Sequence, residues 1–281
     1  MNIISVESLG QCPADHLIID CRFSLADTDL GEQLYLEGHI PGARYAHLDK
    51  HLSGKITPQS GRHPLPDFDL LAAQLEQWGI DPKSRVVTYD DTAGGHAYAA
   101  RLWWLLRALG HTEVAVLNGG IDAWRDAGLA LEQGQPEFEP GHFEAHPDTT
   151  RWHDTAYVQS HLASGDCIVI DARAEARYEG RIEPIDPVAG HIPGSVNMPV
   201  SNNMDARGYM LPAQHLRENY LSLMGNAEPE QVIHSCGSGV FACLGVLAME
   251  EAKLKGSKIY PGSWSEWIRD PARGVATGNT H

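Results

Sequence analysis

The chain has 281 residues, which is enough for two domains of ordinary size. Hydrophobic residues make up 42% of it and charged residues 21%, so the composition excludes a disordered chain and favours a folded globular protein. The formal net charge of -16 argues against nucleic acid and anionic membrane surfaces as partners, because both are bound through basic faces.

The five cysteines fit a reduced, cytoplasmic protein better than a disulfide framework, since their number is odd and no pair has C-x-x-C spacing. Residues 1–10 lack the basic start and apolar run of a signal peptide, and no stretch approaches the length of a membrane span, about 18 apolar residues. The 15 histidines form no H-x-H or H-E-x-x-H pattern. We therefore expect neither a membrane anchor nor a metal site.

A set of four signals occurs twice in the same order, which predicts two domains of one fold. Each set begins with an apolar run that ends in Asp, with an Arg two residues later. It continues with Gly-His-Ile-Pro-Gly and a second apolar run, and it closes with a glycine-containing turn and a Trp. The first set lies at 17–22, 38–42, 86–90 and 118–124, and the second at 168–173, 190–194, 232–236 and 261–267.

Between the two sets, residues 131–150 are rich in Glu, Pro and Gly and have no apolar period, as expected of a linker. We therefore predict an N-terminal domain over residues 1–130 and a C-terminal domain over residues 151–281.

Short apolar runs alternate with helical periods in both halves. The runs at 86–89, 114–117, 168–170 and 231–235 suit strands covered on both faces, as in a parallel sheet. Helical spacing joins Tyr98, Leu102, Leu105 and Leu109 in the first half, and Val240, Cys243, Leu244, Leu247 and Ala248 in the second. The alternation predicts two α/β domains, each a parallel sheet flanked by helices.

Cys236 is the candidate nucleophile, because it follows a predicted strand and precedes a predicted helix, at the sheet edge where open α/β folds bind ligands. Gly237 and Gly239 allow a tight loop whose N–H groups, together with the helix N-terminus, can stabilise a thiolate. Most cysteines are instead small buried hydrophobes, which is the interpretation we prefer for Cys21, Cys167 and Cys243. A core cysteine has no need of the Gly-Ser-Gly loop that follows Cys236.

Two other pairs of repeated residues are expected to be structural. Arg22 and Arg173 each follow a strand-end Asp closely and should form ion pairs. His39 and His191 lie in His-x-Pro-Gly sequences, which are typical of turns.

Over residues 17–278 the chain resembles the tandem-domain rhodanese sulfurtransferases. The resemblance is carried by both Gly-His-Ile-Pro-Gly motifs, by Trp103-Trp104 with residues 117–120, by the loop at 236–240 and by residues 262–267. It implies that the second domain carries the catalytic cysteine and that the first is catalytically silent. Asp90 stands at the position that matches Cys236, and an aspartate cannot carry sulfane sulfur.

The Cys-Gly-Ser-Gly-Val loop is similar to that of the 3-mercaptopyruvate sulfurtransferases. Rhodaneses that prefer thiosulfate tend to have basic residues after the cysteine, where this chain has Gly237 and Ser238. The chain departs from the subgroup at Phe241, where Thr is usual. It also departs at Asp186, where the second of two arginines spaced nine residues apart is expected; Arg177 matches the first.

The expected catalytic residues are Cys236 and Ser238, with Ser238 hydrogen-bonding the departing sulfur or a water that protonates the product. The alternative for Ser238 is a small residue that merely fits a tight loop. The residues expected to bind substrate are Arg177, Arg181, Gly237, Gly239, Val240 and Phe241. Arg181 is included because it can compensate for the missing second arginine. For both arginines, a solvated surface position is the alternative.

The function implied by the resemblance is sulfur transfer from 3-mercaptopyruvate to a thiol or cyanide acceptor through a Cys236 persulfide, with no cofactor and no metal. Thiosulfate as the donor, by the same mechanism, is one alternative. A phosphatase is a second, although the position six residues after Cys236, where that chemistry needs Arg, is Ala242. A binding module without catalysis is a third.

Overall fold

The computed structural model describes residues 2–91 and 95–278. The chain forms two compact units. The first consists of Met1–Gly54, Leu65–Asp148 and Ala206–Met210, and the second of Lys55–Pro64, Thr149–Asp205 and Leu211–His281. Two segments thus depart from the division expected from the sequence: residues 55–64 pack with the second unit, and residues 206–210 with the first.

The described residues of the first unit contain a five-stranded parallel sheet with the strand order β1-β5-β4-β2-β3. Its strands are β1 (Ile3–Ile4), β2 (Leu17–Asp20), β3 (Arg44–Tyr45), β4 (Val86–Tyr89) and β5 (Val114–Leu117). Every residue of the three central strands is buried, because the apolar runs of the sequence are covered on both faces.

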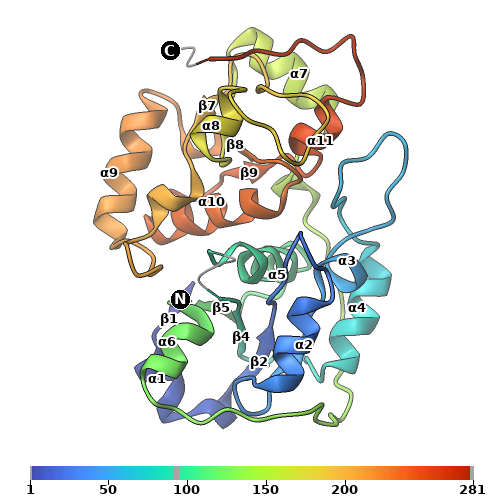
Figure 1. Cartoon of the computed structure of the whole chain (residues 1–281), viewed down its shortest axis with the longest axis vertical. Coiled ribbons are helices and arrows are strands. Elements are labelled where there is room, and N and C mark those ends of the chain that lie inside the picture. Colours follow the sequence, from blue (N-terminus) through green and yellow to red (C-terminus); the bar gives the residue numbers. More distant parts are fainter. Residues whose placement is uncertain (1, 92–94, 279–281) are drawn as a thin grey trace. The chain divides into compact units, whose positions relative to one another are not determined.

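The helices of the first unit are α1 (Val6–Gln11), α2 (Leu30–Glu37), α3 (Leu48–His51), α4 (Phe68–Gln77), α5 (Ala97–Ala108) and α6 (Gly120–Asp126), with a short 3-10 helix at Pro13–Asp15 (Figure 1). Helix α5 contains Tyr98, Leu102 and Leu105 of the expected helical period, Leu109 is its C-cap, and the helix packs on β4 and β5. Nearly all of its side chains are buried, so it forms much of the core beside the sheet.

The described residues of the second unit contain a four-stranded parallel sheet with the order β7-β6-β8-β9. Its strands are β6 (Ile168–Asp171), β7 (Val196–Asn197), β8 (Val232–Ser235) and β9 (Lys258–Ile259). Two α/β domains with parallel sheets flanked by helices are therefore confirmed.

The helices of the second unit are α7 (Thr155–Ser164), α8 (Glu175–Tyr178), α9 (Ala213–Met224), α10 (Val240–Glu251) and α11 (Ser263–Trp267), with 3-10 helices at Thr149–Arg151, Val200–Asn203 and Pro229–Gln231. Helix α10 packs against β8, β9 and α9 (Figure 1). Most of its side chains are buried, including all five whose helical spacing the sequence analysis identifies: Val240, Cys243, Leu244, Leu247 and Ala248. It therefore holds its N-terminus firmly at the carboxyl end of β8.

In each unit one arginine connects the strand-end Asp to the Gly-His-Ile-Pro-Gly motif. Arg22 Nη2 donates to Gly38 O at 2.8 Å while its guanidinium holds the Asp20 carboxylate. Arg173 does the same with Asp171 and Gly190 O, also at 2.8 Å. Each buried ion pair thus ties the end of a central strand to the Gly-His-Ile-Pro-Gly turn, which confirms the structural role expected for both arginines.

The two motif histidines are buried in equivalent surroundings. The Nδ1 atoms of His39 and His191 each lie 2.8 Å from a tyrosine carbonyl, that of Tyr35 and that of Tyr178. Each imidazole also stacks on the ring of the same tyrosine, with centroids 4.1 and 3.7 Å apart. These contacts fix the turns, as expected.

Candidate functional site

The thiol of Cys236 lies at the carboxyl end of β8, in the loop that leads into α10. The residue is only 2% exposed. Its Sγ accepts hydrogen bonds from the backbone N–H groups of Gly239, at 3.1 Å, and Ser238, at 3.4 Å. The loop predicted from the sequence therefore directs two N–H donors at one sulfur, and such an arrangement stabilises a thiolate or another anionic sulfur.

Hydrogen bonds to residues 263–265 fix this loop. The Cys236 N–H donates to Ser263 Oγ at 3.0 Å, and the carbonyls of Cys236 and Gly237 accept from Trp264 N and Ser265 N at 3.0 and 2.9 Å. Gly239 adopts a φ of 82°, and a Cβ there would collide with the backbone of Pro261. This position therefore requires glycine, because the backbone is left-handed and the space is closed.

Two arginines converge on Gly237. A Cβ added to Gly237 would lie 2.9 Å from Arg62 Nη2 and 3.7 Å from both Nη atoms of Arg177. Arg177 comes from α8, and Arg62 comes from the segment at residues 55–64. A glycine at 237 thus leaves room for two guanidinium groups beside the nucleophile loop.

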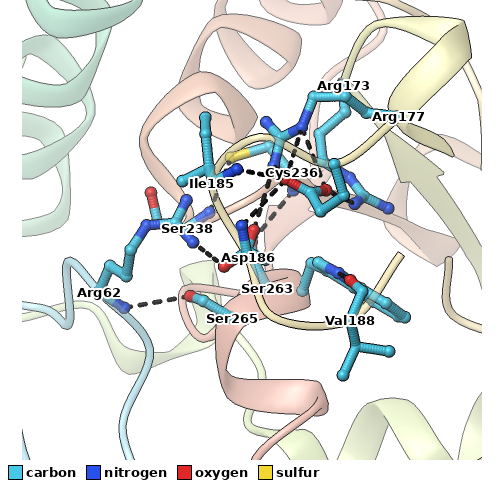
Figure 2. Close-up of polar contacts among 12 residues, drawn as sticks. Arg62, Arg173, Arg177, Ile185, Asp186, Val188, Cys236, Ser238, Ser263 and Ser265 are labelled. Atoms are coloured by element: carbon cyan, nitrogen blue, oxygen red, sulfur yellow. Dashed lines mark hydrogen bonds and ion pairs between the residues drawn. The ribbon is translucent and has the colours of Figure 1, made fainter. Parts of the chain in front are cut away.

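The Arg62 segment is held within the second unit by backbone contacts. Arg62 N donates to Ser265 Oγ at 3.1 Å, and Arg269 Nε donates to Ser60 O at 3.2 Å. Figure 2 shows Arg62 and Ser265 joined in this way. The backbone that bears the Arg62 side chain is therefore held in place beside α11.

Two carboxylates hold the arginines. Asp186 Oδ1 accepts from Arg62 Nη1, and Asp186 Oδ2 accepts from Arg177 Nη2 at 3.1 Å. Glu183 Oε1 accepts from the same Arg177 Nη2 at 2.7 Å. The carboxylates of Asp186 and Glu183 are 3% and 4% exposed, so these ion pairs are shielded from water.

The two carboxyl groups differ in proton affinity. Burial raises the pKa of Asp186 above its ordinary value, and the charge of Glu183 adds to that rise, although Arg62 and Arg177 oppose it. Burial also acts to raise the pKa of Glu183, but hydrogen bonds from Arg177 and from two backbone N–H groups outweigh it, so that pKa is lowered. The two pKa values are therefore shifted in opposite directions.

A third cation lies near the thiol. Burial would lower the pKa of Arg173, but the charge of Asp171 outweighs it, and Glu183 and Cys236 raise the pKa further. The Arg173 guanidinium also faces the Trp264 ring at 4.9 Å. The charge of Arg173 therefore contributes a positive electrostatic field at the loop, while its hydrogen bonds hold Asp171 at the end of β6.

A hydroxyl and an imidazole meet at Ser238. Ser238 Oγ lies 2.7 Å from His63 Nδ1, and both residues are buried. Such a pair can pass a proton between the imidazole and an atom near the Ser238 hydroxyl.

The structure brings most of the predicted site residues together. Cys236, Gly237, Ser238, Gly239 and Val240 form the loop and the first turn of α10, with Phe241 half-buried directly after them. Arg177 reaches this loop.

Arg181 does not join the loop residues. Its side chain is 60% exposed, and its guanidinium pairs with Glu175 and Glu179 on the surface. The alternative of a solvated position therefore describes Arg181, whereas Arg177 is 15% exposed and paired inside the cluster.

Sequence reasoning missed Arg62 and His63. Both lie in a stretch without apolar period, more than 170 residues before the loop that they approach. One signal was available: an adjacent Arg-His pair within a Gly- and Pro-rich segment of an acidic chain. No local rule connects such a pair to a loop in the other half.

The position equivalent to Cys236 in the first unit is filled by a buried carboxylate. Asp90 directly follows β4, as Cys236 follows β8, and its Oδ2 accepts from Tyr98 N at 3.0 Å and Ala99 N at 3.2 Å. His96 Nδ1 lies 3.4 Å from Asp90 Oδ1. Burial would lower the pKa of His96, but the hydrogen bond and charge of Asp90 outweigh it and raise the pKa.

Within the described residues, no cluster of His, Cys, Asp and Glu side chains is arranged to hold a metal ion. Over the same part of the chain, the helices are too short or too polar to span a membrane.

A family model described as "Rhodanese-like domain" matches this chain twice, over residues 6–127 and residues 154–270. Both copies of the four-signal repeat fall within these matches.

Relatives align over nearly the whole chain. A Pseudomonas aeruginosa protein named "Probable 3-mercaptopyruvate sulfurtransferase" is 44% identical, over 94% of this chain and 93% of its own length. A Mycobacterium tuberculosis protein with a provisional name as a thiosulfate sulfurtransferase is 38% identical, over 93% of this chain and 90% of its own length. The solved structure of 3-mercaptopyruvate sulfurtransferase from Leishmania major superposes with a TM-score of 0.85 at 30% identity, covering 96% of this chain and 75% of that one.

Proposed function

The chain belongs to the rhodanese family and is a sulfurtransferase, and we propose that it takes sulfur from 3-mercaptopyruvate and carries it as a persulfide on Cys236. The observation that carries this proposal is that two kinds of anion-binding group surround one thiol. Backbone N–H groups contact Sγ, and the guanidiniums of Arg62 and Arg177 lie at Gly237. The first kind suits an anionic sulfur, and the second suits the carboxylate of the donor.

In the first step the Cys236 thiolate attacks the sulfur of 3-mercaptopyruvate. An S–S bond forms and the C–S bond of the donor breaks, so that its electron pair passes to carbon and pyruvate leaves as the enolate. The outer sulfur of the new persulfide releases its proton to water and lies, as an anion, within reach of the loop N–H groups. Backbone donors that point at developing charge in a buried site favour such a step.

The enolate then needs a proton on carbon. Ser238 Oγ donates it, and His63, hydrogen-bonded to that hydroxyl, returns a proton to Ser238. In the second step the thiolate of an acceptor, or cyanide, attacks the outer sulfur and releases the Cys236 thiolate. The reaction is ping-pong and draws on no cofactor.

A reducing compartment such as the cytoplasm is part of this proposal, because a persulfide carrier needs a reduced thiol. The described residues contain no disulfide, and Cys236 in particular is a free thiol.

Thiosulfate is the second candidate donor, since the relative with 38% identity is named as a thiosulfate sulfurtransferase. Thiosulfate would donate its outer sulfur to the same thiolate and leave as sulfite. Gly237 and Ser238 offer a dianion no charged side chain, however, so the loop itself favours mercaptopyruvate.

Steady-state kinetics of the wild type and Arg177→Lys with both donors test the proposed function. We expect kcat/KM of the wild type to be higher for mercaptopyruvate than for thiosulfate. The lysine keeps the charge but loses the planar fork that holds a carboxylate, so kcat/KM for mercaptopyruvate should fall by about tenfold or more, or about 1.4 kcal/mol.

Arg181→Lys is the matched control, because that arginine lies four residues further along and is exposed. It should leave both efficiencies unchanged. Equal efficiencies for the two donors, or an Arg177→Lys enzyme as active as the wild type, would count against mercaptopyruvate binding at this arginine.

The first unit is catalytically silent in this proposal. Its equivalent helix N-terminus already binds the Asp90 carboxylate, and the donating N–H groups come eight and nine residues later, at Tyr98 and Ala99. In the second unit the N–H donors to sulfur come two and three residues after the cysteine. The loops after β4 and β8 therefore differ in the positions of their N–H donors as well as in the residue at 90 or 236.

Introducing Asp90→Cys into a Cys236→Ser background should consequently leave the protein inactive. Asp91, Thr92 and Ala93 lack the Gly-Ser-Gly sequence that turns N–H groups toward a sulfur, although residues 92–94 lie outside the described residues. Intact mass after donor treatment should show no added sulfur on this double variant. Recovery of persulfide turnover would contradict the silent assignment.

A further inference from the structure

Asp186 occupies the centre of the arginine cluster. It lies between α8 and the second Gly-His-Ile-Pro-Gly motif, and its carboxylate is 3% exposed. One carboxylate oxygen accepts from Arg62 and the other from Arg177. Figure 2 shows Asp186 between these two side chains. The carboxylate thus binds the same two guanidiniums that the proposed function assigns to the donor.

The described charges around Asp186 balance. Three of the side chains are cations and three are anions. The cations are Arg62, Arg173 and Arg177, and the anions are Asp171, Glu183 and Asp186. Arg173 pairs with Asp171 at 2.7 Å and lies 3.5 Å from Glu183. The cluster is formally neutral. Protonation of Asp186, or its replacement by a neutral residue, gives the cluster a net charge of one positive unit.

We propose that Asp186 sets the charge selectivity of the donor pocket, so that a donor with one negative charge is accepted and a dianion is disfavoured. This inference rests on the proposed function, in which the donor anion binds at Arg62 and Arg177. Any anion there shares the guanidiniums with the Asp186 carboxylate. Since Coulomb energy scales with charge, that carboxylate repels a dianion about twice as strongly as a monoanion at the same distance.

The state of the Asp186 carboxyl supports this inference. Burial raises the pKa of Asp186, and a bound anion nearby would favour the protonated carboxyl further. Below that pKa the carboxyl is neutral and its repulsion is lost. The efficiency with thiosulfate, relative to that with mercaptopyruvate, should therefore rise as the pH falls.

The experiment compares Asp186→Asn and Asp186→Glu with the wild type, with both donors. Asparagine keeps an oxygen that can accept from an arginine but carries no charge, whereas glutamate restores the charge. For Asp186→Asn we expect the ratio of kcat/KM for thiosulfate to kcat/KM for mercaptopyruvate to rise by about tenfold, mainly through a lower KM for thiosulfate, and this KM to lose the pH dependence that Asp186 causes. Asp186→Glu should keep the wild-type ratio.

A ratio that stays constant in Asp186→Asn, or equal losses with both donors, would overturn the inference, because either result gives Asp186 a purely structural role. If Asp186→Asn does not fold, the ionic strength dependence of the wild type decides. The net charge of -16 repels a dianion and a neutral cluster does not offset this repulsion, so kcat/KM for thiosulfate should not fall as salt is added, and a steep fall would contradict the inference. Intact mass separates the two claims: a wild type that gains no sulfur on Cys236 from either donor rejects the proposed function itself.

Discussion

Cys236→Ser should abolish sulfur transfer from every donor. A serine hydroxyl in the same loop still meets the N–H groups of Ser238 and Gly239, but an oxygen cannot form a persulfide. The loss should therefore be complete at the level of detection rather than partial, and it should affect mercaptopyruvate and thiosulfate alike. Intact mass after donor treatment should show one added sulfur on the wild type and none on the variant.

Cys12→Ser is the matched control for this experiment. Cys12 is exposed and would be the easiest thiol to modify if sulfur were added without a defined site. Its replacement should leave both turnover and the added mass unchanged. Substantial turnover by Cys236→Ser, or loss of the added sulfur in Cys12→Ser, would place the carrier elsewhere.

Much of the fold could be predicted because its signals are local and repeated. Buried parallel strands are short, continuous apolar runs, and the run that ends in Asp20 is matched by the one that ends in Asp171. The nucleophile loop was also accessible, since a cysteine that merely fills a core does not need glycines after it at the junction of a strand and a helix. In these cases one stretch of sequence contains both the residue and the reason for its position.

The arginine arm could not be predicted in the same way. The spacing from Arg177 suggested that Asp186 replaced a lost cation and that nearby Arg181 compensated for it. The structure instead brings Arg62 to Asp186 from 124 residues away, and it leaves Arg181 on the surface. Spacing along the chain identifies neighbours on one element, but it does not reveal which distant loop supplies a further charge to the cluster.

The Ser238–His63 pair leads to a test that depends on the leaving group. Pyruvate leaves as an enolate and needs a proton on carbon, whereas sulfite leaves thiosulfate without one. If Ser238 supplies that proton, Ser238→Ala should lower kcat with mercaptopyruvate by about 100-fold or more, which is the lower range for general acid catalysis.

The same variant should change kcat with thiosulfate much less, because the N–H of residue 238 that contacts the Cys236 sulfur belongs to the backbone and survives the substitution. His63→Gln should repeat this pattern, since it removes the imidazole, 2.7 Å from Ser238 Oγ, that returns the proton. Thiosulfate thus acts as an internal control for folding and for the nucleophile. Equal losses with both donors would mean that Ser238 shapes the loop rather than moving a proton. Full activity with mercaptopyruvate would mean that water protonates the enolate without Ser238.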